Sequence, residues 1–337
     1  MIKEIIKKLV QKEDLNREEA YSVMLEIMSG RTTDAQIGSF LTALSVKGET
    51  VEEITGCAAA MREKAACIKP EAENLLDTCG TGGDKADTFN ISTCAALIAA
   101  GAGAVVAKHG NRSVTSKCGS ADVLAELGVN IGLAPEKVNE CINRTGIGFM
   151  FAPNFHPAMK YAIGPRREMG IRTIFNILGP LTNPAGARSC IMGLFSPDLL
   201  EPIANVLLNL NVNRAFVVHG DGMDEISLTG VTQVCEIRDE KIKSYLISPE
   251  KYGFNKVAAE SLKGGDAAQN AEIIRKILNG ERGPLYDAAV FNAGFAITAA
   301  GLVDEPSKGI DLARKAVENG GAQSKLSRFI KISKELG

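Results

Sequence analysis

The chain has 337 residues, of which 45% are hydrophobic and 23% charged, and its 38 basic and 40 acidic residues give a formal charge of −2. This balance argues against a nucleic-acid or membrane surface, and no apolar run approaches the roughly 18 residues that span a bilayer. The eight cysteines form no Cys-x-x-Cys pair, which is typical of small buried residues in a reducing, cytoplasmic compartment.

The first part of the chain is helical by its periodicity and by its helix starts. Pro70 marks a boundary, and no strand pattern occurs before Leu75. We therefore expect a small helical domain over residues 1–70. Side chains suited to capping precede its helices: Asn16, Thr33 with Gln36, and Thr50 with Glu53.

From Leu75 onward the patterns alternate between strands and helices. Apolar runs at 75–76 and 104–107 indicate buried strands, and a further strand is expected before Gly132. Alternation of this kind favours a parallel sheet. We therefore predict an α/β fold, in which the helical domain joins a larger α/β domain over 71–337 with a mostly parallel central sheet.

Each of the first two strands leads into a loop that suits a phosphate group. The first loop holds Gly80, Gly82 and Gly83, which let backbone N–H groups approach phosphate oxygens. The second carries Lys108 and Arg112, which would neutralise negative charge. Since ligands of open α/β sheets bind outside the carboxyl ends of strands, the loops predict a site for a multiply charged phosphate. The alternative is that the glycines only form a tight turn.

Helix starts follow both loops and would add a partial positive charge. We expect Ser92 or Thr93 to cap the helix after the glycine loop, and Ser120 to cap the helix after the cationic loop. The glycine loop is neither a Walker A motif nor a dinucleotide-binding fingerprint, because Lys85 stands where each needs a glycine.

The middle of the chain continues with a strand and a long helix. The pattern over 147–152 indicates a buried strand that ends in a loop around His156, and function concentrates in such loops. Residues 156–169 are expected to be helical with an interruption at Gly164-Pro165. A connector punctuated by glycine and proline follows over 173–184.

A buried strand over 215–219 leads into an acidic turn that ends in Asp224 and Glu225. From the residues alone, the pair is either an exposed turn or an ion site. Adjacent carboxylates in extended backbone point apart and can reach different ions or waters. Mg²⁺ prefers one or two carboxylates together with waters and substrate phosphates.

The remainder of the chain is a two-stranded addition over 232–238 and 242–247, followed by helices. Asn292 is a polar residue in a largely apolar helix, where it either satisfies a core hydrogen bond or lines the site. The expected helices cover 268–278, 286–300, 307–318 and 322–336.

The motifs of the chain are Gly80-Thr-Gly-Gly-Asp84, Thr88-Phe-Asn-Ile-Ser-Thr93, Lys108-His-Gly-Asn-Arg112, Gly119-Ser-Ala-Asp122, His156-Pro157, Phe175 to Pro184, and Asp221 to Ser227. Together they resemble the anthranilate phosphoribosyltransferase family, whose relatives of similar fold are the pyrimidine nucleoside phosphorylases. The resemblance covers nearly the whole chain. Lys85 departs from it where the family often has glycine, and Thr115 stands where serine is more usual.

The resemblance implies a glycosyltransferase of tryptophan biosynthesis that uses Mg²⁺. Its reaction would transfer the phosphoribosyl group of 5-phosphoribosyl 1-pyrophosphate (PRPP) to the amine of anthranilate and release pyrophosphate. The resemblance also implies a homodimer through the helical domain, to which a segment near 165–190 returns.

The resemblance also assigns the residues of the site. For the aromatic substrate these are Gly80, His109, Asn111 and Arg166, of which Arg166 would hold the carboxylate, although an isolated arginine is more often a solvated surface charge. For the metal they are Ser92, Asp224 and Glu225. For PRPP they are Gly80, Gly83, Asp84, Thr88, Asn90, Ile91, Ser92, Thr93, Lys108, His109, Gly110, Asn111, Arg112, Ser113, Ser116 and Ser120.

Two other functions were weighed against this one. A pyrimidine nucleoside phosphorylase would share the fold and the glycine loop but would not need the pair Asp224 and Glu225. A non-catalytic relative that binds nucleic acid should show a basic face, which the net charge argues against. An arylamine is unprotonated at neutral pH, so we expect His109 to be a wall of the acceptor site rather than a proton acceptor.

Overall fold

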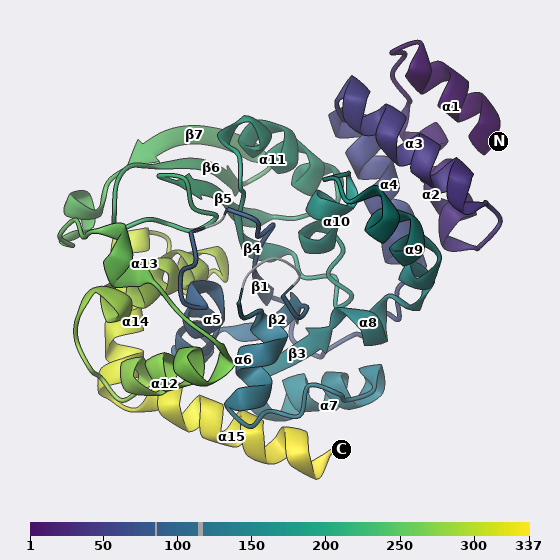
Figure 1. Cartoon of the computed structure of the whole chain (residues 1–337). Helices are drawn as coiled ribbons and strands as arrows, with labels where there is room; N and C mark the ends of the chain where they lie inside the picture. The colour runs from purple at the N-terminus through teal and green to yellow at the C-terminus, as the bar shows by residue number, and fades with distance from the viewer. Residues whose placement is uncertain (85, 114–116) are drawn as a thin grey trace.

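The computed structural model describes residues 1–84, 86–113 and 117–337. Its N-terminal helices form a layer at one side of the α/β part (Figure 1). The predicted caps are confirmed: the side chains of Asn16, Thr33 and Thr50 each accept the N–H of the third helical residue, and that residue's side chain returns the bond. These helices are α1 (Ile2–Val10), α2 (Arg17–Met28), α3 (Asp34–Lys47) and α4 (Val51–Glu63).

In the described part of the chain, seven strands form one sheet in the order β3-β2-β1-β4-β5-β6-β7. Strands β1 to β5 are parallel, whereas β6 and β7 continue from β5 in antiparallel pairing. The mostly parallel sheet and the two-stranded addition are therefore confirmed. The strands are β1 (Leu75–Gly80), β2 (Val105–Gly110), β3 (Ile147–Phe151), β4 (Ser189–Gly193), β5 (Arg214–Gly220), β6 (Thr232–Arg238) and β7 (Lys241–Ile247).

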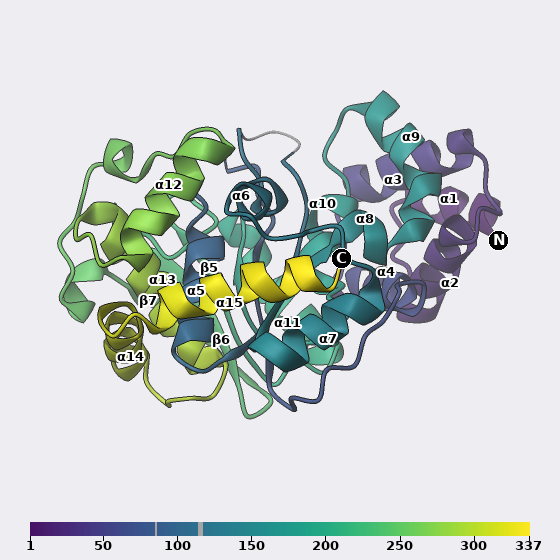
Figure 2. The same ribbon diagram turned by 90° about the horizontal axis from the view of Figure 1, so that it is seen from below.

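Helices cover both faces of the sheet (Figure 2). Successive residues of β4 point to opposite faces, so that Ile191 joins one apolar cluster while Cys190 and Met192 join another. The first cluster lies under α5, α13 and α15, and the second connects the sheet to α10, α11 and the N-terminal helices. The helices are α5 (Ile91–Gly101), α6 (Ser120–Glu126), α7 (Pro135–Thr145), α8 (Ala152–Phe155), α9 (Lys160–Met169), α10 (Phe175–Leu181), α11 (Leu200–Asn209), α12 (Ala267–Leu278), α13 (Pro284–Ala299), α14 (Pro306–Glu318) and α15 (Gly321–Glu335).

The structure corrects three expectations about these elements. The strand expected just before Gly132 is not formed, because Gly128 at φ 100° closes α6 and Pro135 soon starts α7, with no strand between these two helices. Helix α9 is not interrupted at Gly164-Pro165 but contains Pro165, with Ala162 buried against the second cluster. Strand β4 and helix α11 are additions to the predicted elements, and β4 is buried along its whole length between β1 and β5.

The part of the chain that the structure describes contains no helix with the length and hydrophobicity that a membrane crossing requires.

A buried ion pair connects the starts of the N-terminal helices. Glu53 is fully buried, and its carboxylate accepts the Lys47 ammonium at 3.0 Å. The same carboxylate accepts the backbone N–H of Leu15 at 2.9 Å and of Thr50 at 2.8 Å. One side chain therefore satisfies donors from three segments.

We expect Glu53→Ala to lower the free energy of unfolding by about 2–5 kcal/mol, because it leaves two backbone donors unpaired and removes one of the two carboxylate partners of Lys47, which keeps Asp14. The neighbouring Glu52, an exposed partner of Arg17, is the matched control, and Glu52→Ala should cost less than about 1 kcal/mol. Urea denaturation measures both. Equal losses in the two variants would show that the buried pair contributes no more than an exposed one.

Candidate active site

The acidic turn after β5 lies against the glycine loop after β1 and the first turn of α5. The carboxylate of Asp224 accepts the N–H of Gly82 at 2.6 Å, and that of Glu225 accepts the N–H of Ser92 at 3.2 Å. The N–H of Asp224 in turn donates to the carboxylate of Asp84 at 3.3 Å. The loops that follow the parallel strands β1 and β5 thus meet at the carboxyl edge of the sheet, where α/β proteins bind ligands.

Glycine is required where these loops approach each other. A Cβ at Gly80 would overlap the carboxylate of Asp224, and a Cβ at Gly193, at the end of β4, would overlap the carbonyl group of Asp224. Gly82 and Gly83 have φ angles of 63° and 75°, which side chains rarely adopt. The glycines therefore do more than form a tight turn, since they let the acidic loop come within hydrogen-bond distance.

The two predicted caps differ from the structure. Helix α5 starts at Ile91 with Asn90 as its N-cap residue, so Ser92 and Thr93 lie in the first turn. The Asn90 side chain donates to the carbonyl of Cys118 at 3.1 Å and thereby joins the glycine loop to the cationic loop.

Helix α6 likewise starts one residue earlier than predicted, with Gly119 as the N-cap residue and Ser120 as its first residue. The carboxylate of Asp122 accepts the N–H of Gly119 at 3.0 Å and of Ser113 at 3.2 Å. It also pairs with Arg112 at 2.6 Å, so the Arg112 charge is shared with this carboxylate.

The other residues predicted for PRPP lie on the same loops. Thr88 pairs with Lys263 in an antiparallel bridge, and Gly110 ends β2. The carbonyl of Asn111 accepts the N–H of Ala121 at 3.2 Å and the hydroxyl of Ser120 at 3.4 Å. Ser116, together with Lys85 and Thr115, lies outside the described residues.

The carboxylates of the acidic turn are placed where ionisation is disfavoured. Burial, and then the charge of Asp84, raises the pKa of Asp224, while burial, and then Asp224, raises the pKa of Glu225. None of the three carboxylates has an ion-pair partner in the described part of the chain. A divalent cation would relieve this repulsion, so the donor set fits Mg²⁺. Among the described residues no group of three or more His, Cys, Asp or Glu side chains could hold a metal ion, so Mg²⁺ here would also need oxygens from water and substrate.

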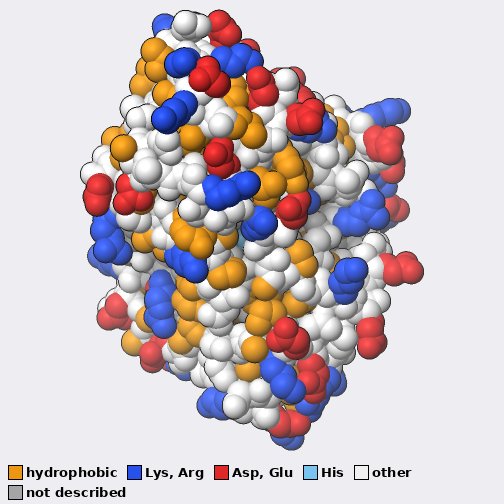
Figure 3. All heavy atoms as spheres, turned by 90° about the vertical axis from the view of Figure 1, so that its right-hand side faces the viewer, with side chains coloured by type: hydrophobic (Ala, Val, Ile, Leu, Met, Phe, Trp, Pro, Cys, Tyr) orange, Lys and Arg blue, Asp and Glu red, His pale blue; other side chains and the backbone are white. Residues whose placement is uncertain are grey.

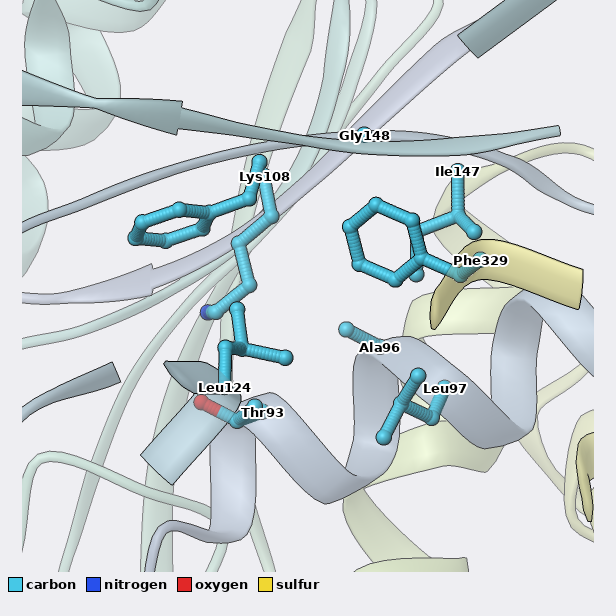
Figure 4. A pocket seen from close by; sticks show the side chains of 9 residues that line it. Thr93, Ala96, Leu97, Lys108, Leu124, Ile147, Gly148 and Phe329 are labelled. Atoms are coloured by element: carbon cyan, nitrogen blue, oxygen red, sulfur yellow. The ribbon is translucent and has the colours of Figure 1, made fainter. Parts of the chain in front are cut away.

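Lys108 lies beneath the strand ends rather than in the open loop. Its side chain is 3% exposed, and its ammonium donates to the backbone carbonyl of Thr78 and, at 3.2 Å, to the Thr78 hydroxyl. Its stem passes through an apolar pocket with Thr93, Leu124 and Phe149 (Figure 4). Burial lowers its pKa, whereas Asp77 and Glu225 favour the charged form. The charge therefore acts on the acidic turn from within the protein.

Two histidines form a buried pair beside the cationic loop. The rings of His109 and His156 are 5.0 Å apart at 55°, and the Nε2 atom of each is buried without a hydrogen-bond partner among the described residues. Burial lowers the pKa of His109 to about 3 and that of His156 to about 4. Both are neutral near pH 7, which suits a wall with free nitrogen atoms. The sequence places His156 in a loop after a buried strand but does not assign it to the site.

Arg166 is half-buried on α9, with its guanidinium 5.0 Å from the ring of Phe175. Its guanidinium makes no hydrogen bond or ion pair with another described residue, so its planar donors are free for a ligand. The adjacent Arg167 is exposed. Of the two neighbouring arginines, Arg166 is therefore the better placed for a ligand anion, whereas the exposure of Arg167 fits a solvated surface charge.

Three further residues, which the sequence analysis does not identify, link the segment around residues 173–184 to the glycine and cationic loops. The carboxylate of Asp77 accepts the side-chain amide of Asn183 at 2.7 Å and the N–H of His109 at 3.2 Å. Arg172 donates to the carbonyl of Gly83 and lies 4.2 Å from the ring of Phe195. Asp77 opens the first motif, but nothing in the local pattern indicates these partners, which are distant in sequence.

Comparisons with known proteins agree over the whole chain. The glycosyl transferase family matches it twice, with its helical bundle domain over residues 3–65 and its a/b domain over residues 72–323. The anthranilate phosphoribosyltransferase of Acetivibrio thermocellus is 53% identical over 334 residues, which cover 99% of this chain and 97% of that protein. The one from Desulfosudis oleivorans is 51% identical over 339 residues and covers both chains completely.

Solved structures are similar as well. Anthranilate phosphoribosyltransferase from Thermus thermophilus superposes with a TM-score of 0.94 at 44% identity, covering 98% of this chain and 99% of that one. The Saccharomyces cerevisiae protein in complex with PRPP and Mg gives 0.91 at 27% identity, covering 99% and 98%. The same yeast protein in complex with 4-fluoroanthranilate gives 0.90 at 26% identity, with the same coverage.

The pKa of His156 predicts a specific pH dependence of stability. Between its ordinary pKa of about 6.5 in the unfolded chain and about 4 in the folded one, the unfolded chain binds more protons, so the folded state loses stability as the pH falls. For this residue the loss from pH 7 to pH 5 should be about 2 kcal/mol.

We expect His156→Asn to lack this part of the loss of stability on acidification. Urea denaturation of variant and parent at pH 7 and pH 5 would measure the difference. The carboxyl groups with raised pKa values act in the opposite direction but equally in both proteins, so they cancel in the comparison. The same loss on acidification in both proteins would show that His156 is not held neutral.

Proposed function

Because the chain belongs to the anthranilate phosphoribosyltransferases of the glycosyl transferase family, we propose that the loops at the carboxyl edge of its sheet are the active site of that reaction. The enzyme transfers the phosphoribosyl group of PRPP to the amine of anthranilate and releases pyrophosphate, a step of tryptophan biosynthesis. The observation that carries the assignment of the site is the contact of the acidic turn with Gly82 and Ser92.

PRPP is proposed to bind along the glycine loop and the start of α5. The N–H groups of Gly83 and Asp84 and the N-terminus of this eleven-residue helix would face its phosphate oxygens. The N–H groups of Thr81 and Gly82 already donate to Gly193 and Asp224. Arg112 would add a planar donor and Lys108 a buried charge, because the leaving pyrophosphate carries several negative charges.

We propose Mg²⁺ as the cofactor, held by Ser92, Asp224 and Glu225. The support is the uncompensated charge of the buried carboxylates and the yeast relative's complex with PRPP and Mg. When bound, the ion would reduce the charge that develops on pyrophosphate. Asp84, which faces the N–H of Asp224, would keep the acidic turn against the glycine loop.

Anthranilate is proposed to bind where Arg166, His109 and Asn111 face the same edge. The free guanidinium of Arg166 can hold the carboxylate, and the neutral imidazoles of His109 and His156 can border the ring without competing for that carboxylate. Displacement at an anomeric carbon passes through an oxocarbenium-like state, so alignment of the unprotonated amine matters more than a strong base.

A homodimer through the N-terminal helices is also proposed. Val46 on α3 is 76% exposed, and Ile163 on α9 and Ile171 are also exposed large apolar side chains. Figure 3 shows apolar side chains interspersed with charged ones on this side of the molecule. Analytical ultracentrifugation would test this: a monomeric parent protein excludes the proposal.

The cytoplasm remains the proposed location, consistent with eight cysteines that form no disulfide among the described residues.

We expect Arg166→Ala to lower kcat/KM for anthranilate about 10²-fold, which corresponds to about 2–3 kcal/mol of charged hydrogen bonding. The KM for PRPP should change little. Arg167→Ala is the matched control, because Arg167 is adjacent and exposed, and it should behave like the parent. Steady-state rates from the fluorescence loss of anthranilate measure all three. Unchanged turnover of Arg166→Ala at low anthranilate would refute its assignment to the carboxylate.

The same assay tests the metal. Without Mg²⁺, in the presence of a chelator, the fluorescence loss with PRPP and anthranilate should stop, and it should return when Mg²⁺ is added. Glu225→Gln should raise the Mg²⁺ concentration for half-maximal rate by at least about tenfold, because it removes one charged oxygen ligand. A chelated enzyme that works at the full rate would exclude the proposed cofactor.

A further inference from the structure

Asn292 of helix α13 contacts the backbone immediately after the acidic pair. Its side chain is 1% exposed. Its Oδ1 atom accepts the N–H of Ile226 at 2.9 Å, and its Nδ2 atom donates to the carbonyl of the same residue at 2.9 Å. The second amide hydrogen reaches the carbonyl of Ala288, one turn earlier in the helix, at 3.0 Å. Of the two roles left open by the sequence, the structure supports the core hydrogen bond, which is made to the residue next to the acidic pair.

We call these two hydrogen bonds to one backbone residue a bracket. They supply the partners that a neighbouring strand would otherwise give to Ile226. Ile226 is buried, so its backbone N–H and carbonyl groups need partners, and one amide side chain supplies an acceptor and a donor together. On the other side of the pair, Gly220 and Met223 exchange two backbone bonds of 2.9 and 3.0 Å. Asp224 and Glu225 are therefore held between a closed turn and a bracketed residue.

The choice of an amide is informative. An aspartate at this position would add negative charge beneath two carboxylates that already repel each other, and a lysine would compete with a bound cation. An amide holds the backbone and leaves the local charge unchanged. Because it belongs to a helix packed in the main core, it also transmits the rigidity of that core to the loop.

We propose that Asn292 is a positioning residue that preorganises Asp224 and Glu225 for Mg²⁺. The proposal rests on the proposed role of these carboxylates in binding the metal. Residues that orient metal ligands typically contribute about 10-fold to 100-fold to the metal affinity.

Asn270 of α12 offers a matched control. It is 2% exposed and brackets Gly265 in the same way, with its Oδ1 atom 3.0 Å from the N–H and its Nδ2 atom 3.1 Å from the carbonyl. Its loop carries none of the proposed metal ligands. Loss of either bracket removes two hydrogen bonds between a buried amide side chain and a loop backbone, although Gly265 is half-buried whereas Ile226 is buried.

The test is a calorimetric titration of Mg²⁺ into enzyme saturated with PRPP, without anthranilate. For Asn292→Leu we expect the Kd of Mg²⁺ to rise about 10-fold to 100-fold, while Asn270→Leu keeps the parent value despite a similar fall in Tm. In turnover assays, raised Mg²⁺ should restore kcat of Asn292→Leu. Asn292→Ser, which leaves room for a water between Ser and Ile226, should fold more readily and show a smaller rise.

Two outcomes separate this proposal from the one on which it rests. If Asp224→Asn loses Mg²⁺ affinity but neither Asn292 variant does, or if Asn270→Leu loses as much as Asn292→Leu, the positioning role is wrong. If Asp224→Asn and Glu225→Gln also bind Mg²⁺ like the parent, the metal assignment itself fails.

Discussion

The structure depends on holding two carboxylates at the edge of a sheet, where burial and mutual repulsion oppose their ionisation. Such a site needs rigid support, because a flexible loop would let its carboxylates rotate away from the protein and into the solvent. The support comes from several directions: Gly80 and Gly193 allow the backbones to meet, the N–H groups of Gly82 and Ser92 face the carboxylates, and Lys108 places a buried charge nearby. The polar edge is thus built from the same elements as the apolar core beneath it.

Local signals predicted much of this architecture, and long-range contacts account for what they missed. The capping boxes at Thr33 and Thr50 can be predicted because each joins two residues that are three positions apart in the sequence. The start of α5 was not, because Asn90 turns its side chain to Cys118, on a loop that only the folded sheet brings near. Strand β4 is a short apolar run that periodicity alone cannot assign. The motifs located the glycine and acidic loops, whereas His156 and Asn292 became interpretable only through their partners.

The N-terminal helices and the sheet are connected by polar contacts as well as by a shared apolar cluster. The buried guanidinium of Arg62 on α4 donates to the carbonyls of Leu181 and Leu210, at the ends of α10 and α11, at 2.8 and 3.1 Å. Arg172 reaches the glycine loop from the other end of the connector, and its carbonyl accepts the hydroxyl of Ser45 on α3 at 3.4 Å. Any shift of the helical layer would therefore be felt at the glycine loop through one short segment.

The reversal of direction between β5 and β6 has a consequence for how the acidic loop can vary. Since Gly220 pairs with Thr232, the segment between them leaves the sheet and returns to it at one place, whereas the parallel strands need a helical crossover. The entropy of closing such a loop grows only slowly with its length. Insertions at residues 230–231, beyond the buried Leu228, would then cost little free energy of folding while displacing the carboxylates. Length changes there would therefore alter the chemistry before they altered the stability.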